Sequence, residues 1–136
     1  MTLPTEGQYR LSKSGNILII EAQGPFNETT VNQYLVDIKL AVEDLKHSPW
    51  ATLAIFSGKG IFSPDAEQII IDITRQRMQN NMVAVATVLT QSAQIDILQM
   101  QLNRIYQACN IVANFFPDSR SALQWLDDYL VEQTVN

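Results

Sequence analysis

The segment that decides the fold is Met82-Val83-Ala84-Val85-Ala86-Thr87-Val88-Leu89-Thr90, a nearly continuous apolar run that is rich in valine. Branched side chains of this kind favour extended backbone. A strand that is apolar at successive positions is covered on both faces, as in the interior of a parallel sheet that carries helices. The run therefore predicts a central strand of an α/β domain.

Extended and helical patterns alternate on both sides of this run. Residues 9–13 and 17–22 are strand-like and are joined by Ser14-Gly15-Asn16, where glycine can take the positive φ of a hairpin turn. Further strands are expected at 50–56 and 111–116. The order β-β-α-β-α-β-α-β-α predicts an α/β fold with a mixed β-sheet and four helices.

Side chains that can cap a helix precede three of the four predicted helices: Asn27, Ser63 and Ser92. The first helix is expected to end near His47, and the second to cover about 65–80. The third runs through Cys109, and the last follows Pro117-Asp118.

Length and composition limit the kinds of protein that this chain can be. With 136 residues, 46% hydrophobic and 17% charged, the chain fits a single globular domain over 1–136 with an ordered core of about 8–131. A net charge of −5 and scattered basic residues argue against nucleic acid as a partner. The chain has one cysteine, no secretion signal and no apolar run long enough to span a membrane. These features predict a cytoplasmic protein.

The residues that could carry out chemistry do not form a recognisable catalytic set. His47, the one histidine, stands at a helix end, where its usual partner is the helix dipole. Cys109 belongs to an apolar helix stripe, and the adjacent acids Glu43-Asp44 and Asp127-Asp128 point in diverging directions. We therefore expect no enzyme activity, no catalytic residue, no bound metal and no cofactor.

The second and third helices carry more apolar side chains than one buried face needs. The extra ones lie off the core-facing stripes and are Ile71, Met78, Ile97 and Met100. Together they predict a patch for a membrane, a partner protein or a second copy of the chain. The alternative is that they are scattered exposed residues, because Val36 and Leu40 also lie off their stripe.

Three stretches carry a resemblance to a known fold: NILIIE at 16–21, WATLAIF at 50–56 and FPDSRSALQWL at 116–126. With the element order, they resemble the STAS fold in its SpoIIAA-like branch, over residues 9–130. That branch is also similar to the CRAL-TRIO lipid-binding domains. The resemblance implies a module that binds a nonpolar small molecule or lipid, or docks reversibly on the inner face of a membrane.

In this hypothesis the second and third helices form a movable cover over the sheet. Ile69, Ile70 and Ile73 would line the ligand site on the inner side of the second helix. The four off-stripe residues would contact the membrane or a partner.

The resemblance also implies an alternative, a phosphorylation switch of the anti-sigma-factor-antagonist type. In those proteins a serine after the third strand is phosphorylated at the start of the second helix. The matching loop here is Ser57-Gly58-Lys59-Gly60, so Ser57 is the candidate phosphoacceptor. Phe56 stands where those proteins have an acidic residue, and the segment that follows is longer. A phosphate on Ser57 would change how a regulatory partner docks.

Overall fold

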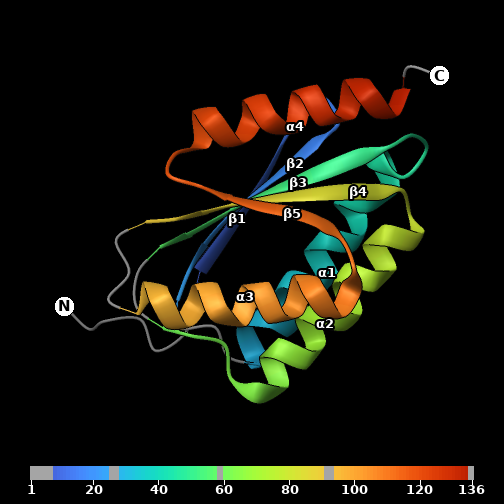
Figure 1. Ribbon diagram of the computed structural model, residues 1–136. Helices are drawn as coiled ribbons and strands as arrows, with labels where there is room; N and C mark the ends of the chain where they lie inside the picture. The colour runs from blue at the N-terminus through green and yellow to red at the C-terminus, as the bar shows by residue number, and fades with distance from the viewer. Residues whose placement is uncertain (1–7, 25–27, 58–59, 91–93, 135–136) are drawn as a thin grey trace.

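The predicted elements all form, in the predicted order. A computed structural model describes residues 8–24, 28–57, 60–90 and 94–134 (Figure 1). Its strands are β1 (Gln8–Ser14), β2 (Ile17–Gln23), β3 (Trp50–Ser57), β4 (Met82–Leu89) and β5 (Val112–Phe116). Its helices are α1 (Glu28–Leu45), α2 (Pro64–Gln79), α3 (Ile95–Cys109) and α4 (Ser119–Thr134).

The strands of the described chain form one mixed sheet in the order β1-β2-β3-β4-β5. β1 and β2 are antiparallel and are joined at Gly15, whose φ of 58° is the left-handed conformation that the turn requires. The remaining neighbours run parallel. Every residue of β4 except Val83 and Leu89 is buried, which confirms that this strand is covered on both faces.

The helices form two unequal layers on the sheet. α1, α2 and α3 cover one face and α4 alone covers the other (Figure 1). Side chains alternate between the layers, so Leu18 and Val85 join the core under the three helices, whereas Ile17 and Leu53 join the core under α4. The sheet therefore has a thick side, on which a site between layers can form, and a thin side.

The start of α2 is the one predicted helix cap that lies within the described residues. Ser63 has extended backbone, and its Oγ accepts a hydrogen bond from the N–H of Ala66 at 3.1 Å. Pro64 follows as the first helical residue, where its missing N–H costs nothing. The other two predicted caps, Asn27 and Ser92, lie outside the described residues.

Helix ends are set by local backbone geometry. α1 ends at Leu45, two residues before His47, and the N–H of Lys46 still donates to the carbonyl of Val42 at 2.9 Å. Lys46 and His47 form a turn, and Pro49 disfavours helical backbone at Ser48. α3 ends at Cys109 and is capped by Asn110, whose φ of 57° is a left-handed conformation that asparagine tolerates.

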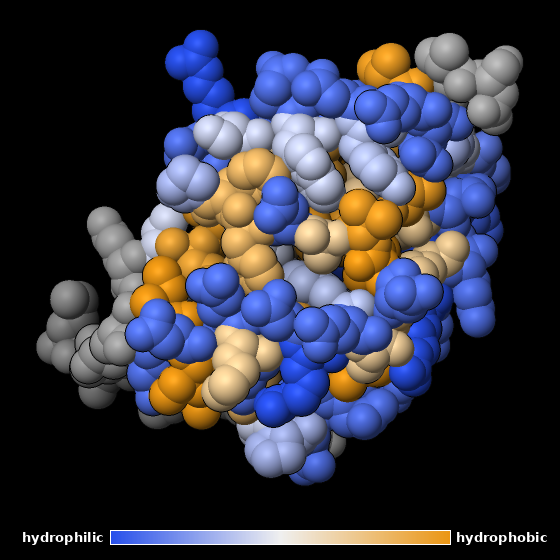
Figure 2. All heavy atoms as spheres, viewed as in Figure 1, coloured by the Kyte–Doolittle hydropathy of each residue, from blue (hydrophilic) through white to orange (hydrophobic). Residues whose placement is uncertain are grey.

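The β5 edge of the sheet keeps apolar side chains partly accessible. Val112 is 43% exposed, and Phe115 and Phe116 are half-buried. In Figure 2, hydrophobic side chains gather in the band between α3 and α4, where β5 runs in Figure 1. On this face of the molecule the apolar surface follows the sheet edge as well as the helices.

Candidate functional site

Ser57, the predicted phosphoacceptor, is the last residue of β3. Its side chain is half-buried, and its carbonyl accepts a hydrogen bond from the N–H of Gly24 at 3.2 Å. Arg10 and Glu21 line the same shallow depression as Ser57. The next two residues of the predicted loop, Gly58 and Lys59, lie outside the described residues. Ser57 thus lies at the carboxyl end of a strand, six residues before the helix cap Ser63.

The serine at the helix start is Ser63. Its Oγ is the cap acceptor, and its carbonyl accepts from the N–H of Glu67 at 2.9 Å. Asp65 and Glu67 add negative charge to the first turn of α2, where the helix dipole favours it. The sequence predicted that Ser63 caps the helix. The observed ends of β3 and α2 show that the β3–α2 loop has a serine on each side, Ser57 before it and Ser63 at its end.

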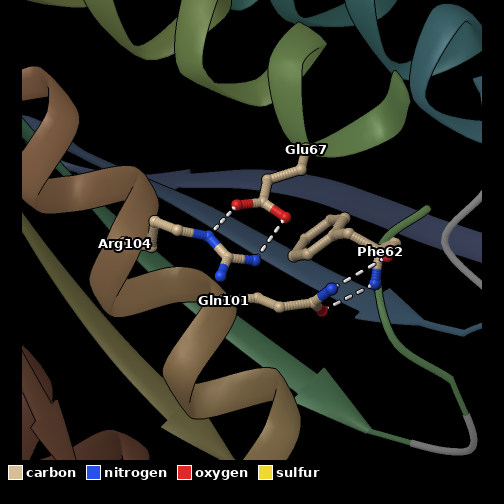
Figure 3. Close-up of polar contacts among 4 residues, drawn as sticks. All are labelled: Phe62, Glu67, Gln101 and Arg104. Carbon is tan, nitrogen blue, oxygen red and sulfur yellow. Dashed lines mark hydrogen bonds and ion pairs between the residues drawn. The ribbon is translucent and has the colours of Figure 1, made fainter. Parts of the chain in front are cut away.

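A buried glutamine of α3 holds the end of this loop. The amide nitrogen of Gln101 donates to the carbonyl of Phe62, and its oxygen accepts from the N–H of Phe62, both at 2.9 Å (Figure 3). Gln101 is 7% exposed and Phe62 is 3% exposed. The side chain therefore pairs with both backbone groups of one residue, as a neighbouring strand would.

An ion pair joins α3 to the first turn of α2 beside the glutamine. Arg104 contacts Glu67 through two parallel contacts, Nε to Oε1 at 2.5 Å and a terminal nitrogen to Oε2 at 2.8 Å (Figure 3). The hydrogen bond from Arg104 holds the pKa of the Glu67 carboxyl below its usual value. Because the Arg104 side chain is 57% exposed, the pair orients the two helices more than it stabilises them. We call Phe62, Glu67, Gln101 and Arg104 the α2–α3 clamp.

The three predicted ligand-lining isoleucines occupy different places on α2. Ile70 lines a cavity beneath the sheet, whereas Ile73 is 3% exposed and also borders a groove between α1 and α2. Ile69 is half-buried against the same core. Ile70 is the member of the predicted set that reaches the cavity.

The four predicted contact residues do not share one environment. Ile71 and Met78 are half-buried and pack against the core, because α1 and α3 both flank α2. Ile97 and Met100 are 42% and 58% exposed on α3. Among the described residues, none of the helices combines the length and apolarity that crossing a bilayer requires.

The cavity lies between the sheet and the three-helix layer and has a volume of about 70 Å³. Its walls come from β1, β2, β3, β4, α1, α2 and α3, and most of its lining is apolar. Two hydroxyls in the wall already have partners: Thr74 donates to the carbonyl of Ile70 at 2.7 Å, and the hydroxyl of Tyr106 bonds that of Thr87 at 2.7 Å.

Arg77 is the charged residue in this wall. It is 7% exposed, and a terminal nitrogen donates to the hydroxyl of Tyr34. Its guanidinium carbon lies 5.2 Å from the centre of the Tyr34 ring, within cation–π range. The sequence analysis missed Arg77, although its spacing held the signal. Arg77 follows Ala66, Ile70 and Ile73 at helical intervals, on the stripe that faces the core.

The residues with catalytic potential lie apart from this cavity wall. His47 is exposed in the turn after α1. Cys109 is buried, and its Sγ donates to the carbonyl of Ile71 at 3.4 Å. Burial raises the pKa of the Cys109 thiol, which disfavours the reactive thiolate. Across the described ranges, no three histidine, cysteine or acidic side chains come together as a metal site would need.

Comparisons with known proteins match the architecture. No family model matches the chain, and no curated protein does. An uncharacterised DUF3478-family protein with a SpoIIAA-like fold, from Shewanella loihica PV-4, superposes with a TM-score of 0.62. It is 19% identical, over 93% of this chain and 98% of its own. The fold is SpoIIAA-like. An anti-sigma factor antagonist from Mycobacterium paratuberculosis has a TM-score of 0.66 and 12% identity, over 94% of this chain and all of its own.

The SpoIIAA-like fold confirms the architecture expected from the sequence, including the order of strands and helices along the chain and the number of helices. At these identities the likeness concerns the fold alone. Neither structure is described as a lipid-binding or CRAL-TRIO protein, so the expected likeness to CRAL-TRIO domains finds no support in them.

Proposed function

We propose that the protein is a non-enzymatic cytoplasmic regulator that acts by binding a partner protein, in the manner of an anti-sigma factor antagonist. The observation that carries this proposal is the likeness to such an antagonist along nearly the whole of both chains. It favours the switch that the sequence analysis held as an alternative over lipid or membrane binding.

The partner surface that we propose combines the end of the β3–α2 loop, at 60–63, with the outer face of α3. The α2–α3 clamp ties these two segments together through Gln101 and Arg104. Met100, which directly precedes Gln101 of the clamp, is 58% exposed, and Ile97 is exposed one turn earlier on α3. Unbranched methionine suits a protein interface because it adapts to the shape of a partner.

Ser57 is the proposed site of regulation. A phosphate on its hydroxyl would add negative charge at the carboxyl end of β3, in the depression that Arg10 shares. Arg10 is 81% exposed and lies 3.9 Å from Glu21, a weak surface pair from which it can turn toward a phosphate. Ser63 is the less suitable acceptor, because its Oγ already caps α2 and Asp65 follows two residues later.

The test begins with modification. Intact-mass analysis after incubation with cell extract and ATP should show one added phosphate, which is lost in Ser57→Ala and kept in Ser63→Ala. A phosphate that stays in Ser57→Ala would exclude Ser57 as the site.

Partner binding is tested next by cross-linking capture with matched surface variants. Met100→Lys should remove a captured protein that the wild type retains. Val131→Lys should keep it, because Val131 is 59% exposed on α4, on the other face of the sheet. Ser57→Asp should alter the capture and Ser57→Ala should not. Equal capture by all four variants would contradict both the surface and the switch.

A further inference from the structure

Arg77 is a buried cation that no carboxylate of the described chain neutralises. The ion pairs of the described residues use other cations: Arg10, Lys13, Lys46 and Arg104. Glu43, which borders the groove on the α1 side of Arg77, pairs with Lys46 at 2.8 Å. A guanidinium stays protonated in proteins, and a buried charge without a counter-ion is strongly unfavourable. An anion would complete this arrangement.

Two hydrogen-bond donors in the cavity wall are unused within the described residues. The Nε–H of Arg77 is buried and has no acceptor. The hydroxyl of Tyr34 accepts from Arg77 and has its own hydrogen to donate. Burial raises the pKa of the Tyr34 phenol more than the nearby Arg77 lowers it, so the phenol keeps that hydrogen. Both residues line the cavity, and Arg77 also borders the groove between α1 and α2.

The cavity limits the size and character of what these donors can bind. A water-sized group occupies roughly 10–15 Å³ on the same measure, so 70 Å³ holds roughly five to seven such groups. The wall beyond Arg77 includes Ile20, Ala54, Val85 and Leu102, which offer no further charge. This volume fits a short acyl chain and is too small for a long fatty acid. An inorganic phosphate would leave most of its acceptors against apolar side chains.

We infer that this cavity binds a small carboxylate with a short apolar chain, with Arg77 and Tyr34 holding the carboxylate and the apolar wall holding the chain. Guanidinium groups recognise carboxylates with paired, charge-assisted hydrogen bonds, so the ligand supplies the missing counter-ion. Gln8 and Tyr9 form the β1 side of the wall, and Gln8 is exposed, which places the approach from solvent on that side. The inference is independent of the proposed partner binding.

The test is an NMR titration of the full chain with sodium butyrate, which has six non-hydrogen atoms, about the number that the cavity volume allows. The Nε–H signal of Arg77 should shift with a saturable dependence on butyrate. n-Butanol, which lacks the charge, should leave it in place at equal concentration. Arg77→Met should weaken binding at least about tenfold, measured by calorimetry, because a charge-assisted hydrogen bond is lost. Arg75→Met is the matched control, an exposed arginine on the same helix, and should bind as the wild type does.

A second variant keeps the test independent of the charge. Ala54→Leu fills the cavity and leaves Arg77 in place, so it should also abolish the shift in a protein that circular dichroism shows to be folded. An Arg77 signal that does not move through the titration overturns the inference. So does an equal shift with butanol, or an unchanged shift in Ala54→Leu.

Discussion

The α2–α3 clamp makes a sharp prediction about stability. Gln101→Ala removes both hydrogen bonds to the backbone of Phe62 without changing the net charge. Each such bond contributes a net 0.5–1.5 kcal/mol, so the variant should lose about 1–3 kcal/mol of unfolding free energy. For a chain of 136 residues this lowers Tm by roughly 3–15 °C. The loss should appear in urea denaturation as a lower midpoint with an unchanged slope.

The same variant should also loosen one defined place. Amide hydrogens in the first turn of α2, at Ala66 and Glu67, should exchange faster, whereas those of β4 should change only with the global stability. Gln107→Ala is the matched control, because Gln107 lies exposed on the same helix and should change stability by less than about 0.5 kcal/mol. If Gln101→Ala and Gln107→Ala prove equally stable, the paired hydrogen bonds do not hold the β3–α2 loop.

Three further predictions concern charge. Without ligand, Arg77→Met should leave the unfolding free energy unchanged or raise it by up to about 2 kcal/mol in urea denaturation. The reason is that burying an unpaired charge costs more free energy than the contact of Arg77 with Tyr34 contributes. A loss of about 2 kcal/mol or more would show instead that Arg77 stabilises the fold. Burial raises the pKa of the Tyr106 phenol from 10.0 to about 12. The stability that the buried neutral phenol contributes is therefore complete below pH 10 and is lost as the pH rises toward 12. Melting curves should show this loss reduced in Tyr106→Phe, and identical alkaline profiles would refute it. The N–H of Ser121 lowers the pKa of Asp118, so that stabilisation is present at neutral pH and is lost as pH falls through the lowered value, below 3.8. In Asp118→Asn the urea midpoint should fall less steeply as the pH is lowered, and an unchanged decline would count against the hydrogen bond from Ser121 to Asp118.

The fold was predictable because its signals are local. The apolar run at 82–90 identified β4, the central parallel strand, without any knowledge of its neighbours. The Ser63-Pro64 pair predicted where α2 begins, because cap and first-turn preferences act within a few residues. The end of α1, expected near His47 and observed at Leu45, was predictable to within two residues because Pro49 follows it.

The sites were less predictable because they depend on contacts between distant segments. Gln101 and Phe62 are 39 residues apart, and no periodicity links them. Arg77 lies on the apolar stripe of α2 by its helical spacing, but its charge suggests a solvated position. Ile71 and Met78 lie off the stripe of α2 as predicted, yet they are half-buried because helices flank α2 on both sides.

The unequal layers give the protein two natural fluorescent reporters. Trp50 is fully buried in the three-helix layer, where its Nε1 donates to the carbonyl of Asn80 at 2.6 Å. Trp125 belongs to the α4 layer, with its ring 5.5 Å from that of Phe116 and 5.9 Å from that of Tyr129. In single-tryptophan variants, the emission spectrum would therefore report on one side of the sheet at a time. Whether α4 detaches before the rest of the chain unfolds can be observed directly with light.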